Sequence, residues 1–144
     1  IKLAFDQVVV TSKLIDGTFP DYERVIPTGN TKYMTVDCAS FRDAVDRVST
    51  ISSERNRAIK IALERDQLTL SATSPETGTA SEDLAVGYPH EKLEIGFNAR
   101  YLLEITQQIE TPEARFAFAD SGSPTLIEGA DGSGALYVLM PMRV

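Results

Sequence analysis

The sequence repeats one order of predicted secondary structure twice, and this internal duplication is what most limits its possible folds. In each copy a β-rich segment leads into a segment with helical periodicity, and three further β-rich segments follow. The copies span about residues 31–88 and 91–144. One copy alone is too short to bury a core, so the two are expected to pair within one domain.

Each copy contains one predicted helix with a polar cap residue before it. Asp37 precedes a helix predicted at 38–50, and Asn98 precedes one at 99–110. Both side chains suit the cap position, because their oxygen accepts a hydrogen bond from a free backbone N–H at the start of a helix. Apolar residues recur at helical spacing in both segments. Those expected to face the core are Phe41, Ala44, Val45, Val48, Leu102, Ile105 and Ile109.

The other apolar segments alternate or cluster in the manner of β-strands. The predicted strands are 32–37, 57–64, 67–74, 79–88, 92–98, 114–120, 124–130 and 134–142. With one helix in each copy, the pattern predicts an α+β fold. The duplicated β-α-β-β-β unit would place two helices on one side of antiparallel sheets.

The duplicated domain, residues 31–144, follows two segments of different character. Residues 1–16 are rich in β-forming residues and are predicted to be the terminal strand or strands of a preceding domain. Residues 17–30 contain two glycines and two prolines, which predicts an inter-domain connector. Because the chain starts with isoleucine inside a predicted strand, we expect a fragment of a longer polypeptide. The connector residues expected to pack along the domain are Phe19, Tyr22, Val25 and Ile26.

Composition and charge exclude several classes of protein. The sequence has no run of 18 apolar residues, so we expect neither a membrane span nor a signal peptide in it. A single cysteine excludes an internal disulfide framework and fits a reducing compartment. The net charge of −7 argues against coating of the whole surface by nucleic acid. The first copy nevertheless contains a local group of cations, which could equally form a solvated surface or a contact with nucleic acid. The group consists of Arg42, Arg47, Arg55, Arg57, Lys60 and Arg65.

Residue types that carry enzyme chemistry are sparse. The only histidine, His90, falls in a predicted exposed turn, and Cys38 is expected to be a small apolar residue because no activating group lies near it in sequence. The glycine-rich segment 130–135 lies between two strands, which predicts a hairpin turn and not a phosphate site. Glu64 and Asp66 flank another predicted turn, which disfavours an enzyme with paired carboxylates. We expect no catalytic residue, no metal and no cofactor.

The chain ends in Met140, Pro141, Met142, Arg143 and Val144. The proline interrupts a predicted strand, and we expect the following residues to lie along the surface toward the connector. Methionine is common at surfaces that accept varied apolar ligands because its side chain adapts its shape. From these residues alone, a core role and a docking role both stay open.

Four features occur in order along the chain: LIDGTFPDYERVIP, the duplicated domain, EIGFNARYLLEI and the terminal YVLMPMRV. Together they resemble the bacterial sliding clamp, the β subunit of DNA polymerase III. The resemblance covers the whole chain and implies the end of the clamp's second domain, the connector and the third domain. It also implies a processivity factor that is not an enzyme. In that family, six domains from two chains close a ring around duplex DNA, with helices lining the hole.

The same resemblance implies partners and residues. In the family, the replicative polymerase, clamp loader, repair polymerases and mismatch-repair proteins insert short glutamine-containing peptides between the second and third domains. The homodimeric ring acts in the bacterial cytoplasm, at the nucleoid and replication fork. The peptide-binding residues implied here are Pro20, Arg24, Val25, Tyr101, Val138, Met140, Pro141, Met142 and Arg143.

Two further surfaces follow from the resemblance. Arg42, Arg47 and Arg100 are implied to face DNA, and Thr50 and Ile51 are implied to lie at the dimer contact. The acidic excess is expected on the outer sheets, which would leave the inner helices positive. The alternative is a DNA-independent peptide-binding or scaffolding module. An acidic helix face would exclude the ring.

Overall fold

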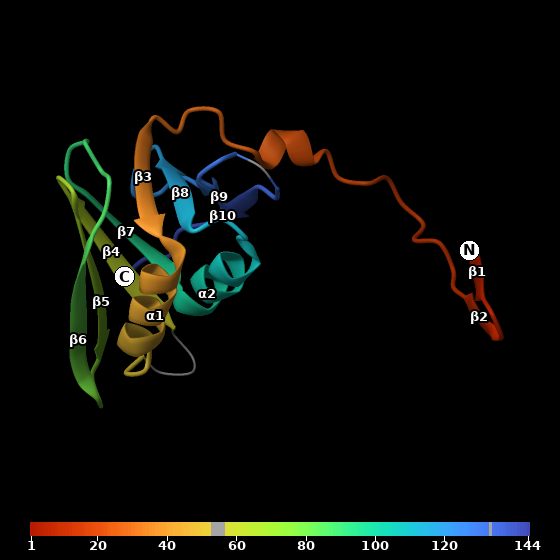
Figure 1. Cartoon of the computed structure of the whole chain (residues 1–144), viewed down its shortest axis with the longest axis horizontal. Helices are drawn as coiled ribbons and strands as arrows, with labels where there is room; N and C mark the ends of the chain where they lie inside the picture. Colours follow the sequence, from red (N-terminus) through yellow and green to blue (C-terminus); the bar gives the residue numbers. More distant parts are fainter. Residues whose placement is uncertain (53–56, 133) are drawn as a thin grey trace.

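The computed structural model describes residues 1–52, 57–132 and 134–144, so Arg55 of the predicted cation group lies outside the described residues. Two sheets and two helices form one domain, and an N-terminal hairpin lies apart from it (Figure 1). The elements are β1 Lys2–Phe5, β2 Val8–Thr11, a 3-10 helix Tyr22–Val25, β3 Lys32–Asp37, α1 Cys38–Ser49, β4 Ala58–Glu64, β5 Gln67–Ser74, β6 Gly78–Ala85, β7 Leu93–Asn98, α2 Ala99–Gln108, β8 Glu113–Phe118, β9 Thr125–Gly129 and β10 Tyr137–Leu139.

The two copies are joined by an exchange of strands. One antiparallel sheet has the order β10-β9-β8-β3, and the other has the order β6-β5-β4-β7. Each sheet therefore combines three strands of one copy with the first strand of the other. Val36 of β3 pairs with Ala114 of β8, and Ile95 of β7 pairs with Ile61 of β4. Neither copy completes its own sheet, which explains physically why the duplicated units form one domain. The predicted α+β fold with antiparallel sheets is confirmed.

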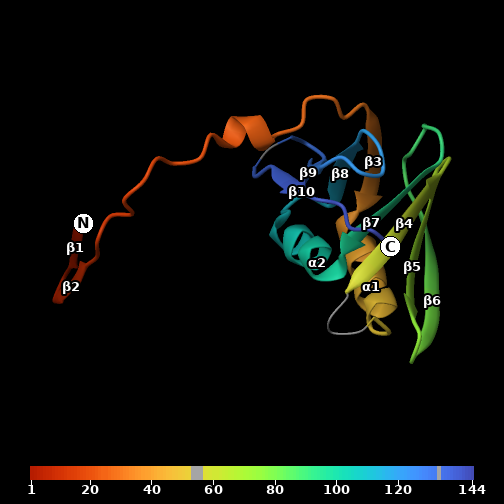
Figure 2. The same ribbon diagram turned by 180° about the vertical axis from the view of Figure 1, so that it is seen from behind.

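Both predicted helix caps are present. The Asp37 carboxylate accepts a hydrogen bond from the Ser40 backbone N–H at 2.8 Å, and the Asn98 side chain accepts one from Arg100 at 2.9 Å. The predicted apolar stripes are buried, except that Ile109 follows the end of α2 and is half-buried. The helices lie side by side in both views (Figures 1 and 2), and they contact each other.

A shared aromatic cluster lies beneath the helices. Phe41 of α1 is fully buried with its ring centroid 5.3 Å from that of Phe116 on β8, and Phe116 stacks on Phe118 at 6.2 Å. Helix α1 belongs to the first copy and β8 to the second, so this cluster also joins the two copies. Neither helix of the described residues is long and apolar enough to cross a membrane.

The N-terminal segment forms a hairpin of two strands. Strands β1 and β2 pair antiparallel, with Phe5 opposite Val8. Asp6 adopts a positive φ of 47° in the turn, a conformation that aspartate tolerates better than most residues. All residues of the two strands are exposed.

The expected packing of the connector along the domain is wrong for most of its residues. Phe19 is 79% exposed and Val25 59% exposed, and only Ile26 and Pro27 are half-buried. The chain reaches the domain at Asn30, whose side-chain amide donates to the carbonyls of Ala117 at 2.7 Å and Pro124 at 2.9 Å. The connector is therefore held at its end by polar contacts, and its apolar side chains project from the domain.

Candidate peptide-binding surface

The C-terminal segment leaves one sheet and docks on the other. Strand β10 ends at Leu139, earlier than the predicted 142, because the Pro141 nitrogen has no hydrogen to donate to a ladder. The Met142 N–H then donates to the carbonyl of Gly96 at 2.8 Å. Gly96 lies in β7, which is the edge strand of the second sheet. The last residues thus lie on β7, and the expectation that they run toward the connector is wrong.

This docking places the tail near the start of α2. Gly96 is two residues before Asn98, the cap of α2, and Tyr101 lies in the first turn of that helix. Tyr101 is 52% exposed and Met140 is 61% exposed. Burying such side chains against a ligand is favourable, by about 25 cal/mol for each Å² of apolar surface removed from water. The chain therefore presents apolar side chains from α2 and from the tail around one end of β7.

The tail also borders an open depression of about 460 Å³. Its walls come from β4, β7, the loop before β9 and the last three residues. Lys60 of β4 pairs there with Glu94 of β7, with 3.4 Å between the ammonium nitrogen and the carboxylate oxygen. The depression consequently combines a polar floor with the side chains of Met142 and Val144.

The connector residues of the predicted site lie elsewhere in this chain. Arg24 pairs with Asp21 within the connector, at 2.9 Å between Nε and the carboxylate oxygen, and Val25 is exposed. In the cavities found among the described residues, no wall combines Pro20, Arg24 or Val25 with the tail. The structure docks the tail on β7, the strand that leads into the helix carrying Tyr101, and none of these cavities joins the connector to the tail.

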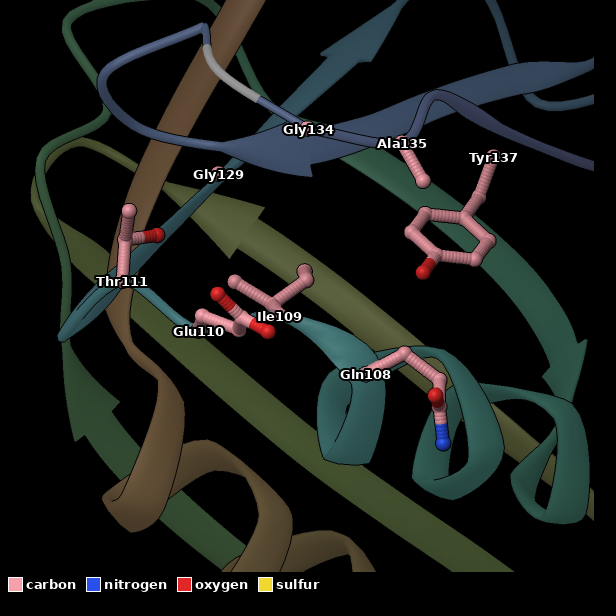
Figure 3. Close-up of a pocket in the computed structure, with 8 residues that line it drawn as sticks. All are labelled: Gln108, Ile109, Glu110, Thr111, Gly129, Gly134, Ala135 and Tyr137. Atoms are coloured by element: carbon pink, nitrogen blue, oxygen red, sulfur yellow. The ribbon is translucent and has the colours of Figure 1, made fainter.

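A smaller cavity of about 250 Å³ lies at the other end of α2 (Figure 3). The Tyr137 ring points from β10 toward α2, and Ile109 and Glu110 lie on the opposite wall. Thr111 completes one side and donates from its hydroxyl to the Glu113 carbonyl at 2.7 Å. None of the predicted site residues lines this cavity.

Among the described residues, the predicted chemical groups have structural roles. Burial raises the pKa of the Cys38 thiol, which keeps it protonated and inert. Asp66 accepts a hydrogen bond from the Tyr88 N–H at 3.2 Å, and Glu64 pairs with Lys92 at 3.1 Å. His90 is half-buried, not exposed, with its ring 5.3 Å from that of Tyr88. In the described part of the chain, no three His, Cys, Asp or Glu residues gather in a possible metal site.

The sequence model of the DNA polymerase III beta subunit, C-terminal domain, matches residues 23–143. The chain belongs to the beta sliding clamp family. It is 50% identical over its whole length to the beta sliding clamp of Caulobacter vibrioides and 41% identical to that of Pseudomonas aeruginosa. It spans 39% of each of these relatives.

Solved sliding clamps have the same fold. The clamp of Bartonella birtlesii bound to griselimycin has a TM-score of 0.94 at 50% identity, over 99% of this chain and 38% of that one. The Pseudomonas aeruginosa clamp has a TM-score of 0.93 at 40% identity, over 99% of this chain and 40% of that one. The described residues therefore form a clamp domain, with part of the chain that precedes it in these relatives.

The helix face of this clamp domain is neutral, so the expectation of positive helices is wrong. Helices α1 and α2 together carry Arg42, Arg47 and Arg100, and an equal number of carboxylates. Arg47 donates two hydrogen bonds to Glu82 on β6, at 3.0 and 2.6 Å, and these lower the pKa of the Glu82 carboxyl. Arg100 donates to Glu104 at 2.8 Å. The carboxylates of the two helices are Asp43, Asp46 and Glu104.

The predicted dimer residues lie at the end of α1. The Thr50 hydroxyl donates to the Asp46 carbonyl at 3.0 Å, which closes the last helical turn. Ile51 packs partly buried against the core, and its carbonyl accepts a hydrogen bond from the Thr77 hydroxyl at 2.7 Å. Part of the Ile51 side chain therefore already packs against the domain's own core.

Three residues that the sequence reasoning missed shape these surfaces. Gly96 receives the tail, Asn30 fixes the end of the connector, and Glu82 holds Arg47. Only Gly96 could have been found from the sequence: a glycine inside a predicted strand often marks the close approach of another backbone. The partners of Asn30 and Glu82 are distant in sequence, and local patterns do not indicate them.

Proposed function

We propose that this chain is the C-terminal part of a replication processivity clamp, and that its tail binds short glutamine-containing peptides of partner proteins. The observation that supports the proposal is the docking of the tail on Gly96 of β7, the strand that leads directly into α2, together with the exposure of Tyr101 and Met140. Family membership supports it, since relatives that share this domain are beta sliding clamps. A clamp of Caulobacter crescentus, with a TM-score of 0.91, has polyethylene glycol bound to a region proposed to tether the β-motif.

In this proposal the complete protein is a homodimeric ring around duplex DNA in the bacterial cytoplasm. It is not an enzyme and takes no cofactor, and it tethers the polymerase by topology. The polymerase, clamp loader, repair polymerases and mismatch-repair proteins would compete for the peptide-binding residues. Pro20, Arg24 and Val25 would join that surface when the rest of the second domain positions the connector. Thr50 and Ile51 would lie at the ring-closing contact.

The test is deletion of Met140–Val144 and measurement of peptide affinity by calorimetry. We expect the deletion to abolish binding of a glutamine-containing peptide. The single change Met142→Ala should weaken binding by about 1–2 kcal/mol, the value of one lost apolar contact. Leu3→Ala is the control, because it removes an exposed apolar side chain of β1, in the hairpin that lies apart from the domain (Figure 1). Unchanged affinity after the five-residue deletion would refute the proposed site.

A DNA-independent peptide-binding module is the second candidate, and the neutral helix face favours it. The two candidates share the peptide surface and differ only in the contact with DNA. Retention of the full-length protein on closed circular DNA, and its release on linearisation, distinguishes a ring that encircles DNA from a module that does not. Arg42, Arg47 and Arg100 would then contact phosphates diffusely or through water, with little sequence preference.

A further inference from the structure

Gly96 lies beneath the C-terminal tail with no space for a side chain. A Cβ atom at this position would lie 2.5 Å from Cγ1 of Val144 and 2.6 Å from the carbonyl oxygen of Met142. The Val144 side chain has freedom to rotate, but the Met142 carbonyl is backbone and moves only with the whole tail. A methyl group at 96 would therefore displace the tail from β7.

The bridge between the tail and Gly96 has a counterpart in the first copy. Gly96 is the fourth residue of β7, and Thr35 is the fourth residue of β3. Thr35 pairs with Gly87, the second residue after β6, through hydrogen bonds of 3.0 and 2.9 Å. In both copies the segment after the last strand thus crosses to the first strand of its own copy in the opposite sheet. The seating of the tail is consequently a repeated feature of the duplicated fold.

We propose that Gly96 is a positioning residue for the peptide-binding surface, an inference that rests on the proposed function. The glycine lets the tail approach β7 closely enough for the Met142 N–H to donate a hydrogen bond to the Gly96 carbonyl. This bond holds Met142 near the helix that carries Tyr101, so that both apolar side chains reach one ligand. Gly96 itself contributes no side chain to that ligand and acts through the tail.

The test is Gly96→Ala in the chain labelled with 13C-methyl methionine. The three methionines are independent reporters, because Met34 is fully buried in β3 whereas Met140 and Met142 belong to the tail. We expect the Met140 and Met142 signals to shift and the Met34 signal to stay. Affinity for a glutamine-containing peptide should fall by about tenfold or more, because a displaced tail loses at least one apolar contact with the peptide.

Gly87→Ala is the matched control, since its added Cβ would lie 2.7 Å from the Thr35 hydroxyl oxygen at the equivalent bridge. It should shift the signal of Met34, the neighbour of Thr35, and leave Met142 and peptide affinity unchanged. If Gly96→Ala does not fold, Val144→Gly provides a second variant that leaves β7 intact and removes the side chain over Gly96. It should shift the Met142 signal and weaken peptide binding in the same direction.

The outcomes separate this inference from the proposed function. If the wild-type chain binds the peptide and Gly96→Ala binds equally well, the inference is overturned. It is also overturned if Gly96→Ala lowers thermal stability without moving the Met142 signal, because the glycine then has only a structural role. If the wild-type chain shows no peptide binding under these conditions, the proposed function fails, and the inference that depends on it fails with it.

Discussion

Replacing Asn30 tests how the connector is fixed to the clamp domain. The side-chain amide donates two hydrogen bonds, to Ala117 and Pro124, and each such bond contributes about 0.5–1.5 kcal/mol net. The Asn30 Oδ1 atom is buried and has no hydrogen-bond partner among the described residues. Because burying an unpaired oxygen destabilises the folded state, removing this atom offsets about 1 kcal/mol of the loss. Taking about 1 kcal/mol for each bond, Asn30→Ala should therefore lower the free energy of unfolding by about 1 kcal/mol. For a domain of this size, that corresponds to a melting temperature lower by roughly 3–6 °C.

Circular dichroism melting at neutral pH measures this loss, and urea unfolding checks it. Thr69→Val is the control, because it removes an exposed hydrogen bond to Asp83 while retaining the branched shape of the side chain. Its effect should stay within about 0.5 kcal/mol. Asn30→Asp keeps the shape but loses both donors and buries a charge, so it should destabilise more than alanine does. A melting temperature of Asn30→Ala within about 1 °C of wild type would refute the anchoring role.

Two further changes test the core and the first helix. Phe41→Ala should lower the free energy of unfolding in urea by about 3–5 kcal/mol, because the ring is fully buried against Phe116 of the other copy. A loss below about 1 kcal/mol would contradict a core shared between the copies. Hydrogen bonds from the Ser40 hydroxyl and N–H lower the pKa of Asp37 in the folded state. Its stabilising effect is therefore present above the ordinary pKa of about 4 and is lost as the pH falls through the lower folded value. On acidification, the melting temperature of Asp37→Asn should therefore fall less than that of the wild type. The same pH profile in both proteins would contradict this role of Asp37.

Local patterns predicted the elements of the domain well because helices and their caps are encoded over a few residues. Asp37 and Asn98 cap their helices as predicted, and strands 32–37 and 67–74 have the predicted bounds. The exchange of β3 and β7 was not predicted, since periodicity shows which face of a strand is buried but not which strand lies beside it. Residues 1–16 divide into two strands at a turn in which Asp6 takes a positive φ, a conformation that the sequence pattern alone does not fix.

The candidate site was harder to predict than the fold. The exposure of Tyr101 and Met140 agrees with a docking surface, but the course of the tail was set by a single close contact at Gly96. Apolar residues in the connector indicated burial, yet the pattern does not say against which surface. The expectation of positive helices followed from the resemblance to a ring around DNA, whereas the pairing of Arg47 with Glu82 depends on the packing of β6 beside α1.

The central claim is that the tail and α2 form one surface for partner peptides, and a structure of the chain with such a peptide tests it most directly. A glutamine-containing peptide is predicted to lie against Tyr101, Val138 and Met140, next to the place where the tail docks on β7. A peptide seated elsewhere would contradict the account. One such place is the cavity lined by Ile109, Glu110 and Tyr137 at the C-terminal end of α2.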